Sequence, residues 1–154
     1  MREDVLGGTL AELNSTSADI EASAVISTDG LMMAAMLPQG LDQDRVGAMS
    51  AAILSLGDRT SAELGRGSLE QVLIRGDRGY VLMTHAGEEA VLTVLATPDA
   101  KLGLIFLDVK RAAAAISSSG PMLMTREISR LGRALPPSNC QTGMPAARAT
   151  RSSP

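Results

Sequence analysis

The stretch SAVISTDGLMMAAM, residues 23–36, decides the fold of this chain. An Asp-Gly pair at 29–30 divides an apolar run, and this pair is the two-residue signature of a type I′ turn between antiparallel strands. We therefore expect a hairpin with strands at 20–28 and 31–36. Both arms are apolar on both faces, which is typical of strands covered by helices on each side. The hairpin predicts a sheet sandwiched between helical layers.

The methionines of the second arm, Met32, Met33 and Met36, leave two roles open for the hairpin. Methionine is a flexible filler of irregular core gaps, and it also forms adaptable binding faces. The core role is the default interpretation.

Three further strands follow later in the chain, at residues 68–75, 79–86 and 90–97. The segments RGDRG and HAGEE link them and have the glycine and aspartate content and the shortness of hairpin loops. The chain is therefore expected to continue as a three-stranded meander.

Three helices are expected around these strands. Residues 3–13 carry acids in their first turn, where the helix dipole favours anions. Asp42 is the expected N-cap of a long helix that runs to about Leu64 and ends at Gly65. A third helix is expected over residues 99–118.

The faces of the two longer helices follow from the spacing of their side chains. In the long helix the i, i+3, i+4 rule predicts a core stripe of Val46, Met49, Ile53, Leu56, Thr60 and Leu64. In the last helix the predicted buried stripe is Leu102, Ile105, Val109, Ala112 and Ile116. The segment KLGLIFLDV is apolar nearly all round, so we expect it to be covered on more than one side.

A second row on the long helix consists of small side chains, Ala48, Ala51, Ala52 and Ser55. Small side chains permit another helix to approach closely, whereas a solvated face more often carries Glu, Lys and Arg. Two interpretations stay open, a helix-to-helix dimer contact and an alanine-rich surface.

Length and charge divide the chain into a body and a tail. With 154 residues, the chain is long enough for one domain, expected over residues 1–120. This part has nine basic and sixteen acidic side chains, whereas residues 121–154 have five and one. Arg126, Arg130 and Arg133 are spaced as in a short basic helix over 121–135, and residues 136–154 have the composition of a disordered segment.

Several functional classes are excluded by composition. The acidic body and the shortage of aromatic residues argue against a nucleic-acid groove. No apolar run approaches the ~20 residues that span a bilayer, and the N-terminus lacks a signal-peptide pattern. The single cysteine, Cys140, excludes an intramolecular disulfide and a thiolate metal cluster, so we expect a reducing, cytoplasmic setting.

The motifs of enzymes are missing as well. The chain has no P-loop, no dinucleotide fingerprint, no nucleophile elbow and no Cys/His ligand spacing. Its single histidine, His85, is interpreted as a satisfied or solvated residue at the end of a strand. Glu88 and Glu89 belong to a solvated turn, and so does the Arg75-Gly76-Asp77 tripeptide. No catalytic residue, cofactor site or metal site is predicted.

Taken in order, these features form a pattern: a short helix, AVISTDGLMMAA, a long helix, and LEQVLIRGDRGYVLMTHAGEEAVLTVLATPDAKLGLIFLDVKRAAAAI. The pattern resembles the dynein light chain Roadblock family, particularly its bacterial MglB-like branch, which regulates Ras-like small GTPases. The hairpin, the meander ending LATPDA and the KLGLIFLDVKRAA helix carry the resemblance, which covers roughly residues 4–118.

The resemblance implies an α+β fold of order α-β-β-α-β-β-β-α. In it, a five-stranded antiparallel sheet has the first and last helices on one face and the long helix on the other. It also implies a homodimer in which the third strands pair into a continuous sheet while the long helices pack alongside. The interface would then include Gln71, Leu73 and Arg75 of the third strand with the row Ala48, Ala51, Ala52 and Ser55.

For function, the resemblance implies a non-enzymatic dimeric regulator that binds a bacterial Ras-like small GTPase and biases its nucleotide cycle. Arg45, Arg59 and Arg78 are weak candidates for partner contact. The alternatives are a passive scaffold that tethers a GTPase or sensor kinase, and a small-molecule sensor, which would need a polar-lined pocket. The basic tail either docks on an acidic partner or membrane surface or is a solubilising extension.

Overall fold

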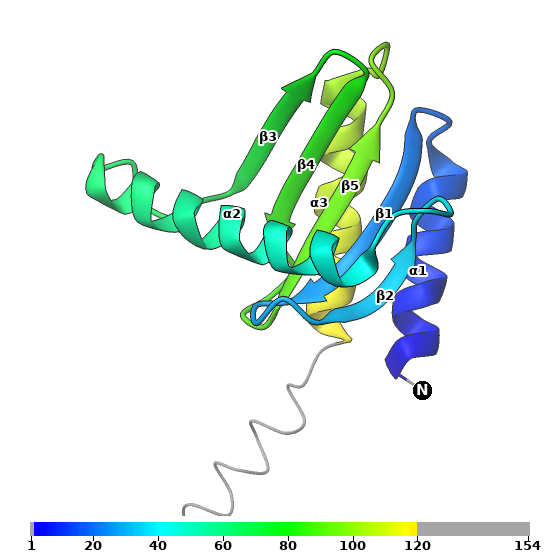
Figure 1. Ribbon diagram of the computed structural model, residues 1–154, viewed down its shortest axis with the longest axis horizontal. Coiled ribbons are helices and arrows are strands. Elements are labelled where there is room, and N and C mark those ends of the chain that lie inside the picture. The colour runs from blue at the N-terminus through cyan, green and yellow to red at the C-terminus, as the bar shows by residue number, and fades with distance from the viewer. Residues whose placement is uncertain (1, 120–154) are drawn as a thin grey trace, which may run out of the picture. The chain divides into compact units, whose positions relative to one another are not determined.

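A computed structural model describes residues 2–119, except for the side chain of Arg2. This part forms a single α+β unit with the predicted order of elements (Figure 1). Every element boundary lies within three residues of its predicted position. The elements are α1 (Arg2–Thr16), β1 (Ile20–Ser27), β2 (Met32–Met36), α2 (Gln43–Glu63), β3 (Gln71–Gly76), β4 (Gly79–His85), β5 (Ala90–Ala96) and α3 (Leu102–Ser118). The segments 121–135 and 136–154, for which a basic helix and disorder are expected, lie outside the described residues.

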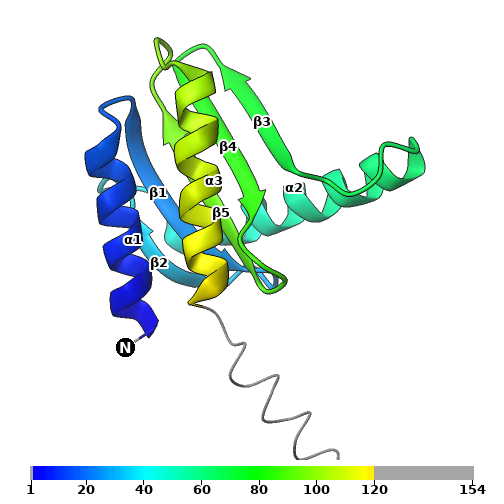
Figure 2. The same ribbon diagram turned by 180° about the vertical axis from the view of Figure 1, so that it is seen from behind.

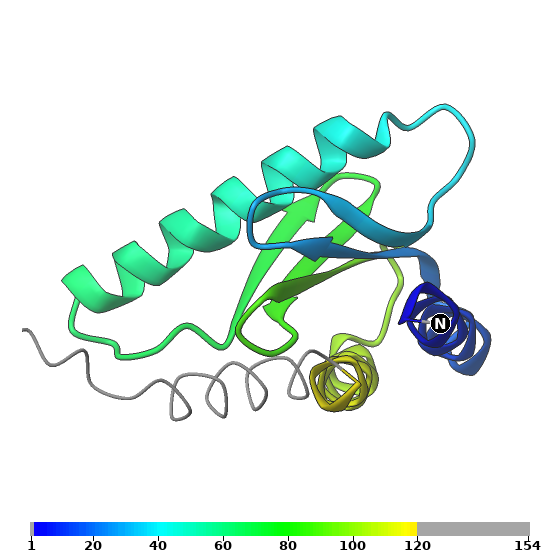
Figure 3. The ribbon, with the colours of Figure 1, turned by 90° about the horizontal axis from the view of Figure 1, so that it is seen from below.

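The five strands form one antiparallel sheet in the order β2-β1-β5-β4-β3. The first hairpin inserts beside β5, so that β1 and β5 lie in the interior of the sheet and β2 and β3 form its two edges. Helices α1 and α3 lie side by side on one face, and α2 crosses the other face (Figures 2 and 3). The expected sandwich of a sheet between helical layers is confirmed.

The hairpin forms as predicted, but its turn is not type I′. That turn needs positive φ at both central residues, whereas Gly30 has φ +89° and Asp29 does not have a positive φ. The Gly30 N–H donates to the Ser27 carbonyl at 2.9 Å, and the Ser27 N–H donates to the Leu31 carbonyl at 2.8 Å. The connection is a three-residue loop, which needs one left-handed residue at its end, and Gly30 supplies it.

Two apolar layers fill the sandwich, one on each face of the sheet. Between the sheet and helices α1 and α3 lie side chains such as Leu10, Leu92 and Ile105, and between the sheet and α2 lie Ile26 and Leu54, all essentially buried. The hairpin methionines divide as their positions on the strand require. Met32 and Met33 pack, half-buried, against opposite layers, whereas Met36 is exposed.

The predicted core stripe of α2 is wrong. Met49, Leu56 and Leu64 are 50%, 65% and 67% exposed, and Thr60 is exposed as well, while Val46 and Ile53 are half-buried. The buried residues of the helix are instead Gly47, Ser50 and Leu54. The reason is steric, because the helix lies so close to the sheet that small residues occupy much of its contact face.

Two glycines make this close approach possible. A Cβ on Gly47 would collide with the carbonyl oxygen of Gly30 in the hairpin loop. A Cβ on Gly57 would lie 2.9 Å from Leu69 and 3.1 Å from Val72, next to and within β3. From there the C-terminal half of α2 extends past β3, beyond the edge of the sheet (Figure 1).

The buried stripe of α3 is confirmed, with Ile105, Val109 and Ile116 in the core and Leu102 half-buried. The helix begins three residues later than predicted because Asp19 holds the preceding loop. Its carbonyl accepts from the Thr97 N–H at 2.9 Å, and its carboxylate accepts from the Lys101 N–H at 3.3 Å.

The expected all-round cover of the first turns of α3 is wrong for the described chain. Leu104 is 57% exposed and Leu107 is 55% exposed. The sheet and α1 cover one side of the helix, and its outer side has no neighbour among residues 2–119.

The two kinds of helical glycine predict opposite effects of one substitution. Gly47→Ala should lower the free energy of unfolding by about 2 kcal/mol, because the new methyl group meets a backbone oxygen that cannot move aside. Gly8→Ala is the control, since open space surrounds Gly8 within α1, and it should raise stability by about 1 kcal/mol. Urea denaturation measures both. A gain in stability from Gly47→Ala would contradict the contact.

A buried hydroxyl predicts a stabilising substitution. The Thr93 hydroxyl is buried between β5 and α2 and has no hydrogen-bond partner among the described residues. Thr93→Val should therefore raise the free energy of unfolding by about 1 kcal/mol. Thr84→Val should lower it, because the Thr84 hydroxyl donates to the Glu70 carbonyl at 2.8 Å. Equal effects of the two substitutions in thermal melts would contradict this assignment.

Candidate protein-interaction surface

Strand β3 is an open edge of the sheet. It pairs with β4 on one side, and no strand within residues 2–119 pairs with its other side. All its residues are exposed except Val72, which is half-buried. An exposed edge strand presents unpaired backbone N–H and C=O groups that readily pair with another strand.

The three β3 residues predicted at the interface, Gln71, Leu73 and Arg75, lie on one face of this strand. Leu73 is opposite Leu82, whose side chain belongs to the core beneath α1 and α3. Arg75 is opposite Tyr80, and its guanidinium lies 5.9 Å from the centre of that ring. The trio therefore points to the face that carries α1 and α3, whereas Val72 and Ile74 point to the face that carries α2.

The outward side of α2 supplies a second exposed element beside this edge. Its apolar members are Met49, Leu56 and Leu64. Of the predicted small row, Ala48, Ala52 and Ser55 are exposed and Ala51 is half-buried. We call this side of α2 together with the open edge of β3 the α2–β3 surface. Apolar side chains gathered on a surface in this way mark interaction sites more often than scattered ones do.

Polar contacts hold the C-terminal half of α2 in place. Asp58 and His85 form a hydrogen bond of 2.9 Å between the Asp58 Oδ2 and the His85 Nε2 atoms, which connects the helix to the end of β4. The Ser61 hydroxyl donates to the Gly67 carbonyl at 2.8 Å in the connection to β3. His85 is thus a satisfied histidine at a strand end, as interpreted from the sequence.

The three candidate arginines are exposed but do not form one cluster. Arg45 and Arg59 lie near opposite ends of α2, and Arg78 lies in the β3–β4 turn. Within residues 2–119, none of the three has a side-chain hydrogen bond or ion pair. They are available to a partner as separate contacts.

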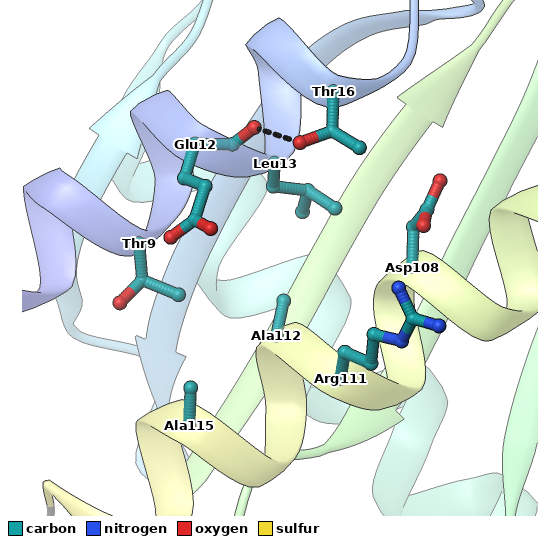
Figure 4. Close-up of a pocket in the computed structure, with 8 residues that line it drawn as sticks. All are labelled: Thr9, Glu12, Leu13, Thr16, Asp108, Arg111, Ala112 and Ala115. Carbon is teal, nitrogen blue, oxygen red and sulfur yellow. Dashed lines mark hydrogen bonds between the residues drawn. The ribbon is translucent and has the colours of Figure 1, made fainter.

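The helices on the opposite face enclose a small groove between α1 and α3 (Figure 4). Its volume is about 300 Å³, and Leu13 and Ala112 are among its apolar lining residues. The hydroxyl of Thr16 donates to the Glu12 carbonyl at 2.7 Å, and that of Thr9 donates to the Val5 carbonyl at 3.0 Å. Since both hydroxyls already donate to backbone of α1, they do not supply free donors to a small-molecule ligand.

Residues 2–119 have neither a metal-binding cluster nor a membrane-spanning helix. Among residues 2–119, no three His, Cys, Asp or Glu side chains gather in a way that could hold a metal ion. None of the described helices combines the length and the apolar character that crossing a membrane requires.

Comparison with known sequences identifies relatives over most of the chain. The Roadblock/LC7 domain family matches residues 7–96. The "Uncharacterized protein MJ1340" of Methanocaldococcus jannaschii is 45% identical over 109 residues, which cover 71% of this chain and 94% of that protein.

Comparison with solved structures identifies the same fold. The gliding protein MglB of Thermus thermophilus superposes with a TM-score of 0.69 at 20% identity, over 77% of this chain and 90% of that chain. A Roadblock/LC7 domain of Streptomyces avermitilis superposes with a TM-score of 0.65 at 24% identity, over 77% of this chain and 97% of that one. At such identities the likeness concerns the fold.

Proposed function

Because this chain belongs to the Roadblock/LC7 domain family, we propose that it is a homodimeric regulator of a Ras-like small GTPase. The family resemblance inferred from the sequence is confirmed, and the family consists generally of regulators and adaptors without catalytic chemistry. The α2–β3 surface is the observation that carries the proposal, because it offers a copy of the chain an open strand and an exposed helix together.

The homodimer forms by antiparallel pairing of β3 with β3 of the copy, which extends the sheet to ten strands. Residues opposite each other in such a pair point to the same face. Leu73 therefore lies opposite Leu73 of the copy or, if the register shifts by two residues, opposite Gln71 or Arg75, which point to the same face. A shift by one residue would place Leu73 opposite residues of the other face.

The long helices pack across the same two-fold axis. The C-terminal half of α2 extends past β3, so it reaches over the copy's sheet when the two edges join. Met49 and Leu56 are then removed from water, and small residues such as Ala52 let the helices approach closely. This arrangement explains why α2 has apolar side chains on the side that faces away from its own sheet.

The dimer acts on the GTPase by binding, without a catalytic group of its own. A partner that prefers one arrangement of the GTPase switch segments shifts the population toward that arrangement and changes the rate of hydrolysis or nucleotide release. Arg45 and Arg59 on α2 and Arg78 in the β3–β4 turn are the contacts that we assign to this partner. A scaffold that binds the GTPase without changing either rate is the alternative.

The dimer predicts the effect of a bulky charge on α2. The wild-type chain should have twice its monomer mass of 16.0 kDa in light scattering, and Ala52→Arg should halve the observed mass because the long side chain separates the helices. Ala11→Arg, on the exposed side of α1, is the matched control and should remain dimeric. A dimeric Ala52→Arg variant or a monomeric wild type would refute this interface.

Regulation predicts a saturable change in GTP turnover. Each Ras-like GTPase of the source organism is titrated with the wild-type chain, and both phosphate release and nucleotide release are measured. One GTPase should respond, the response should vanish with Ala52→Arg, and Arg59→Ala should weaken it about tenfold if a charged contact is lost. Arg66→Ala, in the loop after α2, is the control. Binding with unchanged rates would establish the scaffold instead.

A further inference from the structure

The face that carries α1 and α3 leaves one strip of sheet uncovered. Helix α1 packs on β1 and β2, and α3 packs on β4 and β5, so no helix of residues 2–119 covers β3 on this side (Figure 2). Leu73 points to this face and is exposed. The strip is bounded by α3 on one side and ends at the open edge of β3 on the other.

A cavity of about 640 Å³ lies along this strip. Its α3 wall includes Gly103, Phe106, Leu107 and Lys110, and strand residues such as Gln71 line the sheet side. We call it the α3–β3 trough. A Cβ on Gly103 would have nothing within 4 Å, so this wall is open and free of obstruction. The lining of the trough is mixed, with apolar side chains such as Phe106 and Leu107 on α3 and polar ones such as Gln71 and Thr84 on the sheet.

Two basic side chains, one in the trough and one beside it, lie on this face of the sheet. Lys110 lies in the α3 wall of the trough. Arg75 lies beside the trough, on the same face of the sheet and toward the β3–β4 turn. Neither residue has an ion pair within the described part of the chain. Glu70 is the acidic lining residue.

The proposed dimer gives this trough a definite width. Because α3 contacts both β4 and β5, its axis lies about one and a half strand spacings from β3. Pairing of β3 with its copy therefore places the two α3 axes about four spacings, or ~19 Å, apart at ~4.8 Å per strand. Helices pack at interaxial distances of ~8–10 Å. The space between the two α3 helices consequently fits one further helix.

We propose that the two troughs of the homodimer join into one groove that binds a single amphipathic helix of a partner protein. The helix places apolar side chains against Leu73 on the floor formed by the paired β3 strands and against Leu107 of each protomer. Its flanks are acidic, because Lys110 lines each trough and Arg75 lies on the same face of each β3 strand. The site is incomplete in one chain, and it takes one helix for every two chains. The inference rests on the proposed homodimer.

The experiment uses a peptide of about 14 residues, which as a helix spans the ~20 Å of a six-residue strand. Leucine occupies one face and glutamate both flanks, and a second peptide has lysine at every glutamate position. Fluorescence anisotropy and calorimetry with the full chain should show saturable binding of the glutamate peptide, one peptide per two chains, and weaker binding of the lysine peptide.

Neighbouring residues of α3 provide matched controls. Lys110→Glu should weaken binding about tenfold, whereas Arg111→Glu, which makes the same charge change beside the α1–α3 groove, should leave it unchanged. Leu107→Ala should likewise weaken binding, and Leu104→Ala should not, although the two leucines are similarly exposed.

The outcomes separate this inference from the dimer itself. The mass of every sample is measured by sedimentation. A dimer that does not bind the glutamate peptide, that binds one peptide per chain, or that responds equally to Lys110→Glu and Arg111→Glu would overturn the groove alone. A monomeric wild type would refute the proposed homodimer, and the groove with it.

Discussion

The structure depends on the close contact between α2 and the β1–β2 loop, where Gly47 meets the carbonyl oxygen of Gly30. This contact, with Gly57 against Leu69 and Val72, lets the helix lie on the sheet without large side chains beneath it. Since much of the contact face of α2 consists of small residues, its large apolar residues are left on the outer side. The helix also crosses the sheet at an angle that takes its C-terminal half past β3 (Figure 1).

Most of the fold could be predicted because its signals are local. The Asp-Gly hairpin, the N-cap at Asp42 and the glycine after α2 each depend on a few neighbouring residues, and the structure places all three elements as expected. The Asp42 carboxylate accepts from the backbone N–H groups of Asp44 and Arg45, as an N-cap should. The first residue of α3 could not be predicted as well, because a residue far away in the sequence, Asp19, fixes where that helix begins.

The side of α2 that faces the core could not be predicted from periodicity. Its sequence offers two faces, one with Met49 and Leu56 and one with Gly47, Ser50 and Leu54, and hydrophobicity alone favours the first. The contact between Gly47 and the backbone of Gly30 determines which face lies on the sheet. A periodic pattern of hydrophobic residues holds no information about this contact. The exposed stripe then resembles a core stripe because, in the proposed dimer, it is buried by a second copy. The small row beside it is singled out by side-chain size, and its role in a dimer contact stays a prediction.

The two surfaces of the proposed dimer have different chemistry and lie on opposite faces of the sheet. The α2 side has Arg45 and Arg59, which are assigned to a GTPase, and the α3 side has the trough with Lys110 and Leu107 in its wall. Both depend on the pairing of β3 with its copy. Hydrogen–deuterium exchange of residues 71–76 tests that pairing directly, because alternate N–H groups of β3 point away from β4. The proposed dimer predicts that the whole strand is protected from exchange at high protein concentration and that the outward N–H groups lose this protection on dilution. Rapid exchange of the outward N–H groups at every concentration would contradict it.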